Sequence, residues 1–228
     1  ITSRHLFLAL AMILIGAGIF LYPYCFRQHK CLIDVSKSRP VGYKAEPDSL
    51  GWRPLFNGYD ISGWKKTNFG PQGPVHVDKK EQTLFLGIGD GCTGVTWKRR
   101  FPRLNYEISL DAKRIKGTDF FCGLTFPVKD EFCTLIVGGW GGTTVGISNI
   151  DGKDASENAT SKLLVFENQK WYPIRLQVNK KKIVVWIDKK KIINIPIKNH
   201  RFSVRPEVGL SKPIGICSWR TAAAYKNI

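Results

Sequence analysis

The sequence has few of the residues from which common catalytic centres are built. Its four histidines are scattered along the chain: His5, His29, His76 and His200. The patterns C-x-x-C, C-x-x-C-H and H-E-x-x-H are absent, and so is the G-x-S-x-G turn that carries a serine nucleophile. These absences argue against the common zinc and haem sites and against serine-hydrolase chemistry.

Acidic residues are also scarce relative to basic ones. The 228 residues include 18 Asp and Glu against 35 Lys and Arg, a formal net charge of +17. Residues 1–50 hold 6 basic and 3 acidic residues, so most of the excess, 29 against 15, belongs to residues 51–228. The basic residues are spread over turns and strand ends and accompany no nucleic-acid-binding motif. We therefore expect a partner subunit with an acidic surface, or an anionic lipid surface, and no nucleic acid.

Long helical patterns are missing after residue 50. Short alternating, β-branched and aromatic runs recur between Gly, Pro, Asn and Asp instead, which is typical of an all-β sandwich or barrel. With 43% hydrophobic residues, the chain can build one ordinary core. The predicted strands cover residues 83–89, 106–115, 120–128, 132–139, 143–150, 162–167, 172–178, 182–187 and 191–197.

The clearest local pattern is a three-stranded meander after Tyr172. Its strands are residues 174–178, 183–187 and 192–195. Asn179 and Asp188 begin the two turns, because their side chains bond to nearby backbone and tolerate turn conformations. Each turn carries three consecutive lysines, so we expect two groups of lysines at opposite ends of these strands.

The N-terminal stretch Leu6–Tyr22 contains no charged residue over 17 positions, and the uncharged run continues to Phe26. At about 1.5 Å per residue, a helix of this length nearly crosses a hydrocarbon core of about 30 Å. A cleavable signal peptide is the alternative, but bulky residues follow the run and no A-x-A site is present. We predict a transmembrane anchor within residues 1–26, with residues 6–26 in the membrane, and a linker over residues 27–50.

The orientation of this anchor does not follow from charge, because basic residues flank both of its ends. A single N-terminal anchor before a β-rich domain most often exports that domain. We therefore expect a single-pass protein of a bacterial inner membrane, with the domain on the exported, periplasmic side.

Residues 55–64, with the sequence LFNGYDISGW, resemble the opening LFNG-x-D-x-x-GW of the 3-keto-disaccharide hydrolase domain family. Further segments match the family pattern: 83–87, 106–110, 171–175, 208–210 and 225–228. The resemblance covers about residues 51–228. It implies a concanavalin-like, two-sheet antiparallel jelly roll, and it favours a planctomycete-type subgroup.

The chain departs from the hydrolase-like members in its middle. Where many members carry an acidic strand, residues 132–142 read FCTLIVGGWGG. We therefore expect a membrane-anchored, non-catalytic module that is an accessory or structural subunit of a membrane or envelope complex or a glycan-binding module. The alternative implied by the resemblance is a glycoside-processing enzyme of the 3-keto-disaccharide hydrolase type.

Carboxylate pairs are the natural candidates for glycoside chemistry. Glu107 and Asp111 share one strand face but lie four residues, roughly 13 Å, apart, which is too far for direct cooperation.

The densest acidic cluster is the loop of Asp151, Asp154 and Glu157, our candidate for a catalytic role or for Ca²⁺. A turn whose side chains cap their own backbone is the alternative for this loop. No other cofactor is expected. Asn158 also begins a glycosylation sequon.

Sugar recognition on jelly rolls uses exposed aromatic rings beside planar polar groups. The candidate ligand-binding residues are therefore Trp140, which is flanked by glycines, and the pair Trp219 and Arg220.

Cys122 and Cys133 fall on one predicted hairpin, where either a disulfide or two buried thiols would fit.

Overall fold

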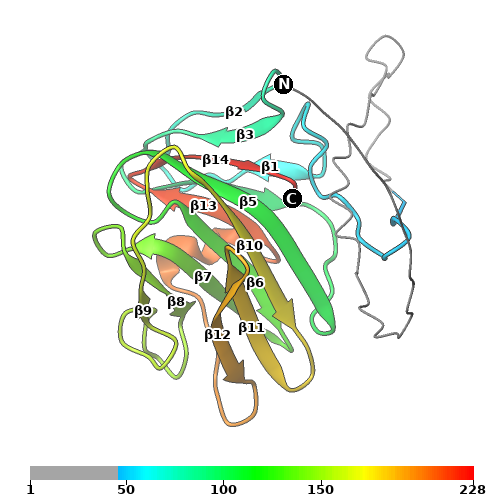
Figure 1. Cartoon of the computed structure of the whole chain (residues 1–228), viewed down its shortest axis with the longest axis vertical. Helices are drawn as coiled ribbons and strands as arrows, with labels where there is room; N and C mark the ends of the chain where they lie inside the picture. The colour runs from blue at the N-terminus through cyan, green and yellow to red at the C-terminus, as the bar shows by residue number, and fades with distance from the viewer. Residues whose placement is uncertain (1–45) are drawn as a thin grey trace, which may run out of the picture. The chain divides into compact units, whose positions relative to one another are not determined.

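The computed structural model describes residues 46–228, which form two packed antiparallel β-sheets (Figure 1). Sheet A has the order β1-β4-β13-β6-β7-β8-β9. Its strands are Trp64–Lys66, Cys92–Trp97, Gly215–Trp219, Cys122–Val128, Glu131–Gly139, Thr144–Ser148 and Lys162–Leu163. Sheet B has the order β12-β11-β10-β5-β14-β3-β2. Its strands are Lys190–Pro196, Lys182–Ile187, Trp171–Val178, Tyr106–Lys116, Ala222–Lys226, Thr83–Leu86 and Val75–Asp78. The predicted two-sheet antiparallel sandwich is confirmed.

The predicted membrane segment, residues 6–26, lies outside the described residues. In residues 46–228, no helix is long and apolar enough to cross a membrane. The helical element of this part of the chain is the short 3₁₀ helix η1, Pro206–Ser211. The anchor, the linker and their boundaries therefore remain predictions.

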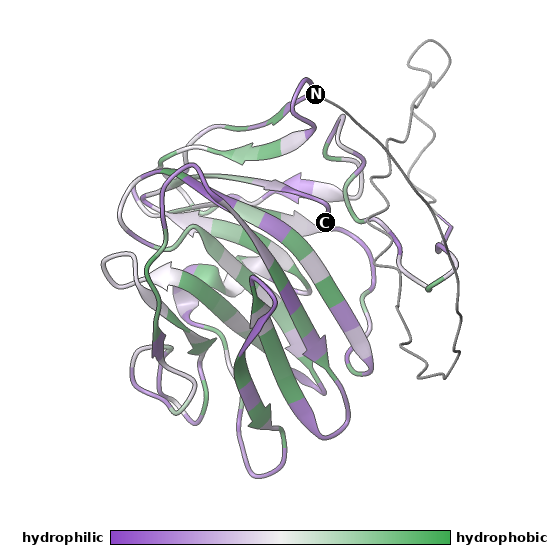
Figure 2. Ribbon diagram, viewed as in Figure 1, coloured by the Kyte–Doolittle hydropathy of each residue, from purple (hydrophilic) through white to green (hydrophobic). Residues whose placement is uncertain are grey.

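One hydrophobic core fills the space between the two sheets. In β5, Ile108, Leu110 and Ala112 point inward and are buried, while the residues between them are more exposed. Figure 2 shows the resulting alternation of hydrophobic and hydrophilic bands along the long strands of sheet B. Each strand therefore buries one row of side chains, and the opposite row forms the outer face of its sheet.

The predicted meander is β10, β11 and β12. Val178 faces Ile183 across the first turn, and Ile187 faces Lys190 across the second. The Asn179 carboxamide oxygen accepts hydrogen bonds from the amides of Lys181 and Lys182, at 2.8 and 2.9 Å, as a turn-forming Asn should. The two groups of lysines lie at opposite ends of β11, as expected.

The segment 55–64 joins the two ends of the described domain. The amide of Leu55 donates to the carbonyl of Ile228 at 2.7 Å, and the Trp64 indole donates to the carbonyl of Leu55 at 2.6 Å. The Asn57 carboxamide oxygen accepts from the amides of Tyr59 and Asp60 and so forms the turn between these contacts. The motif that carries the family resemblance thus has a structural role.

The four cysteines in the described part of the chain are buried free thiols: Cys92, Cys122, Cys133 and Cys217. In the β6–β7 hairpin, Cys122 faces Val137 and Cys133 faces Phe126, so the two cysteines are not opposite each other. Burial raises the pKa of Cys122 to about 12. Of the two alternatives for this pair, the structure has the buried thiols and not the disulfide.

Candidate functional site

The outer face of sheet A is covered by two loops instead of facing solvent. A second hydrophobic cluster forms there around Phe120, Ile136 and Val208, on the side of the sheet opposite the main core. Glycine allows the close approach of the covering loops. A Cβ atom at Gly146 would lie 2.5 Å from the carbonyl oxygen of Ala155, and one at Gly215 would lie 2.6 Å from Cβ of Ser211.

A pocket of about 200 Å³ remains open beside these loops. Its aromatic walls are Trp140, whose side chain is 42% exposed, and the partly buried Trp219. Its other lining residues are Cys92, Asp119, Phe120, Thr134, Ile136, Ser148, Arg205, Glu207 and Val208. The lining combines an apolar surface with a few polar groups, the usual composition of a small-ligand site.

Trp140 is held outward by the conformation of its turn. Positive φ angles occur at Gly138, Trp140, Gly141 and Gly142, and Trp140 adopts its value of 46° without being a glycine. Buried Arg114 on β5 fixes the turn, because its guanidinium donates to the carbonyl of Gly142 at 3.3 Å. The same guanidinium donates to the carbonyl of Phe166 at 2.7 Å and to the side chain of Asn168 at 2.9 Å.

Asp119 lies half-buried at the base of the Trp140 turn. Its carboxylate accepts a hydrogen bond from the amide of Phe120 at 2.7 Å and another from the amide of Trp140. Burial raises the pKa of Asp119 nevertheless, because the loss of water outweighs these bonds and the attraction of Arg114. The carboxyl therefore both supports the turn and retains a proton at higher pH than an ordinary aspartate.

The charged groups at the rim of the pocket neutralise one another. Arg205 donates to Asp154 at 3.1 Å and to Glu207 at 2.9 Å. The hydrogen bond from Arg205 lowers the pKa of Glu207 and keeps its carboxylate ionised. This network places oriented donors and acceptors beside the two tryptophans without a large net charge.

Two of the three predicted ligand-binding residues meet at this pocket. Trp140 and Trp219 come from distant parts of the sequence and line the same hollow. Arg220 does not line it: the guanidinium donates to the exposed carboxylate of Asp90 at 2.7 Å and lies 5.9 Å from the Trp219 ring.

The three acidic loop residues are not gathered around one ligand. Asp151 pairs with His200 at 2.6 Å and accepts from the amide of Arg201, and these contacts lower the pKa of Asp151. Asp154 caps the Ser156 amide at 2.9 Å and pairs with Arg205, whereas Glu157 is exposed. The loop thus forms a turn whose side chains bond to its own backbone, and calcium binding by these residues stays a prediction. Over residues 46–228, no group of three or more His, Cys, Asp or Glu side chains could hold a metal ion.

Asn158, at the start of the sequon, is part of this loop's structure. Its side-chain amide donates to the carbonyls of Ile147 and Asp154, at 2.7 and 2.6 Å, and its oxygen accepts from the amide of Thr160. These bonds attach the loop to β8.

The rejected pair, Glu107 and Asp111, lies on the outer face of sheet B. Glu107 accepts from Gln177 at 2.6 Å, and Asp111 accepts from Asn227 at 2.7 Å. Each carboxylate has its own partner, which agrees with the expectation that the two do not cooperate.

Sequence analysis missed Asp119, Arg205 and Glu207. Asp119 lies just before a strand, and the other two lie around η1, so only the folded chain brings them to one pocket. The sequence holds one weak indication of this site. In Arg205-Pro206-Glu207, two opposite charges flank a proline in the segment that follows the last predicted strand.

Comparisons with known proteins agree with this architecture. The family sequence model of the 3-keto-alpha-glucoside-1,2-lyase-like domain matches residues 51–228 of this chain. The chain therefore belongs to that family. No protein of curated function matches the sequence significantly. The assignment to a planctomycete-type subgroup stays a prediction.

Solved structures of similar fold include two carbohydrate-active enzymes. The β-glucanase of Bacillus licheniformis has a TM-score of 0.51 at 10% identity, over 75% of this chain and 93% of the glucanase. The Crh5 transglycosylase also has a TM-score of 0.51, at 11% identity, over 75% of this chain and 79% of the transglycosylase. The carbohydrate-binding module CBM66 of Bacillus subtilis has a TM-score of 0.46 at 11% identity, over 72% and 92%. The two enzymes establish a shared concanavalin-like fold.

Proposed function

We propose that this member of the 3-keto-alpha-glucoside-1,2-lyase-like family is a membrane-anchored, non-catalytic module that binds one sugar unit between Trp140 and Trp219. The observation that carries the proposal is the pairing of the exposed indole of Trp140 and the partly buried indole of Trp219 with oriented polar groups in one pocket. At about 200 Å³, the pocket is smaller than the about 300–1,000 Å³ typical of drug-sized ligands. It suits a single pyranose, whose apolar face stacks on an indole while its hydroxyls bond to the rim.

The carboxylates of sheet A support a role in binding rather than hydrolysis. Its strands carry one acidic residue, Glu131, at the exposed first position of β7. The outward residues in the middle of β7 are Thr134 and Ile136, which offer no acid or base. The two pocket carboxyls, Asp119 and Glu207, are already engaged with backbone amides and with Arg205. Hydrolysis normally requires two free carboxyls facing the glycosidic bond.

Titration calorimetry with a panel of monosaccharides tests this proposal. The panel contains glucose, galactose, N-acetylglucosamine and 3-ketoglucose. At least one sugar should bind, and Trp140→Ala should weaken its binding while Trp186→Ala, a change on sheet B, should not. Binding that is equally weakened by both substitutions, or absent throughout the panel, contradicts the proposal.

A second candidate is an elimination catalyst, and the raised pKa of Asp119 favours it. In a 3-keto-glucoside the proton on C2 is acidic because it lies next to the ketone. A 1,2-lyase transfers that proton to a base as the C1–O bond breaks, and the departing oxygen takes up a proton. Asp119, half-buried with a raised pKa, would be the base.

Product analysis separates this candidate from the binding module. The purified protein is incubated with a 3-keto-glucoside, and release of the C1 substituent is followed by chromatography. Release that is lost in Asp119→Asn would establish the enzyme. Retention of the substrate, together with measurable binding, is the result that we expect.

A further inference from the structure

Within residues 46–228, the outer face of sheet B is more exposed than that of sheet A. Residues on this face come from alternate positions of β5, β10 and β14, with Trp171 opposite Lys113 in the β10–β5 register. Lys226 lies on the neighbouring strand β14, opposite Asp111 of β5. Among residues 46–228, Glu46 and Trp52 lie beside this face, where they share a hollow with Ser109 and Lys226.

Two lysines converge on one tryptophan at this face. The ammonium nitrogens of Lys113 and Lys226 lie 4.6 and 4.4 Å from the centre of the Trp171 ring. Within residues 46–228, neither ammonium forms an ion pair with a carboxylate. Two like charges are therefore held on one indole, each without an ion pair, and an anion that binds there would relieve their repulsion.

The carboxylates of the same face have hydrogen-bond partners of their own, although Asp111 keeps its charge because its partner is neutral. Glu107 accepts from Gln177 and pairs with Arg175 at 3.5 Å, and Asp111 accepts from Asn227. Arg175 also covers the ring of Trp186, with its guanidinium carbon 3.9 Å from the ring centre. More lysines lie at the ends of these strands: Lys180, Lys181, Lys182, Lys189, Lys190 and Lys191. Basic and aromatic side chains thus outnumber the two carboxylates on this face.

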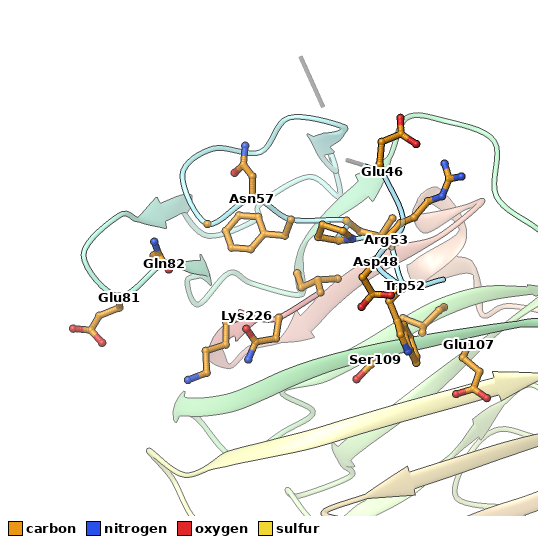
Figure 3. A pocket seen from close by; sticks show the side chains of 17 residues that line it. Glu46, Asp48, Trp52, Arg53, Asn57, Glu81, Gln82, Glu107, Ser109 and Lys226 are labelled. Carbon is orange, nitrogen blue, oxygen red and sulfur yellow. Dashed lines mark hydrogen bonds between the residues drawn. The ribbon is translucent and has the colours of Figure 1, made fainter. Parts of the chain in front are cut away.

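The described chain begins against this same side of the domain. Glu46 and Trp52 line a hollow of about 750 Å³ together with Ser109 of β5 and Lys226 of β14 (Figure 3). Leu50 is 82% exposed and Trp52 is 38% exposed, so apolar side chains are accessible in this segment, and Trp52 shares the hollow with Lys226. The preceding residues 27–45 contain five Lys and Arg and one acidic residue, and they follow the predicted anchor.

We propose that the outer face of sheet B lies on an anionic lipid surface, with Trp171, Lys113 and Lys226 at the contact. This proposal rests on the anchor of the proposed function. Indole rings and lysines both favour the headgroup layer, where the indole is half solvated and each ammonium meets lipid phosphate. The exposed Leu50 and Trp52 add apolar contact, which a soluble acidic protein would not require. Because the two sheets face opposite ways, this docking would direct the Trp140–Trp219 pocket away from the membrane.

Lysine acetylation in vesicles tests the docking of this face. The full chain is reconstituted in vesicles of neutral phosphatidylcholine, and in matched vesicles with one-third phosphatidylglycerol. Mass spectrometry then measures the acetylation rate of each lysine. Lys113 and Lys226 should react about fivefold more slowly on the anionic vesicles, and high salt should abolish the difference. Lys65 and Lys66, on sheet A, should react equally in both.

A charge-matched pair of variants sharpens the test. Lys113→Gln/Lys226→Gln removes two charges from sheet B, and Lys65→Gln/Lys66→Gln removes two from sheet A. The protection of Lys182 should fall in the first variant and persist in the second. Circular dichroism confirms that both variants are folded.

Several results would overturn the docking. Equal acetylation in the two kinds of vesicle, or equal protection of both sheets, would show that sheet B does not face the lipid. Protection of Lys113 by inorganic phosphate or by polyglutamate, to the level reached on anionic vesicles, would assign the face to a free anion or to an acidic protein. Failure of the chain to float with neutral vesicles would contradict the anchor alone. In that case the acetylation rate of Lys113 on the anionic vesicles still tests whether sheet B docks on the lipid.

Discussion

Outward-facing side chains on sheet A are mostly small, whereas those on sheet B are long, charged or aromatic. Gly146 and Gly215 let loops pack directly onto sheet A, and the pocket forms where this covering is incomplete. On sheet B, Trp171 and Trp186 are partly buried and are covered by lysine and arginine side chains. Both sheets bury one face in the same core, so side-chain size on the other face decides whether it becomes a lined pocket or an open basic surface.

Removal of Arg114 should be the most damaging change on the side of the Trp140 turn. Arg114→Met leaves the carbonyls of Gly142 and Phe166 without their donor, and we expect a loss of about 3 kcal/mol in the free energy of unfolding. Lys113→Met, the adjacent residue on the open face of sheet B, should cost less than about 1 kcal/mol. Urea unfolding measures both. Equal losses would show that the turn does not depend on its buried guanidinium.

The packing of the loops on sheet A should also depend on the size of the side chains beneath them. Gly146→Val would overlap the carbonyl oxygen of Ala155 and should lower the free energy of unfolding by about 2 kcal/mol. Ser109→Val, in the middle of β5 on the open face, should change it by less than about 0.5 kcal/mol. Thermal unfolding of the two variants gives the comparison. A stable Gly146→Val protein would mean that the loop moves away at little cost.

Sugar affinity should distinguish the aromatic residues of the two faces. Trp140→Ala should raise the dissociation constant of the bound sugar about tenfold, because the stacking surface is lost. Trp186→Ala, on sheet B, should leave this constant unchanged. Calorimetry on both variants provides the measurement, and the opposite ranking would move the sugar site to sheet B.

The rim of the pocket should add a small, pH-dependent stability. Arg205 lowers the pKa of Glu207 below its ordinary value of 4.5, so the ionised carboxylate stabilises the folded state. This stabilisation is present above that ordinary value and is lost as the pH falls through the lowered pKa. Because the pair is well exposed, we expect Glu207→Gln to cost about 0.5 kcal/mol at neutral pH and nothing at low pH. Urea unfolding at neutral and at low pH measures the loss in free energy of unfolding caused by Glu207→Gln. A loss that grows as the pH falls would contradict the expected stabilisation.

Sequence reasoning predicted the strands that alternate clearly and the meander with its Asn179 and Asp188 turns. It did not predict β1, β2, β4, β13 or β14, which are short or are buried on both faces. β4, for example, is buried at all six positions and so has no alternating pattern. The pairing of Trp140 with Trp219 followed only from the fold, because the two residues belong to different strand ends. Asp119 and Arg205 were missed for the same physical reason: a pocket residue on a loop is defined by the neighbours that the fold brings to it.

The order of the strands also constrains how the chain is synthesised. The last two strands, β13 and β14, lie in the interior of their sheets, β13 between β4 and β6 and β14 between β5 and β3. Sheet A cannot be completed until residue 219 has left the ribosome, and sheet B cannot be completed until residue 226 has, so earlier strands wait with open edges during translation. Chaperone protection of the nascent chain should therefore matter more for this protein than for one whose final strand joins an edge.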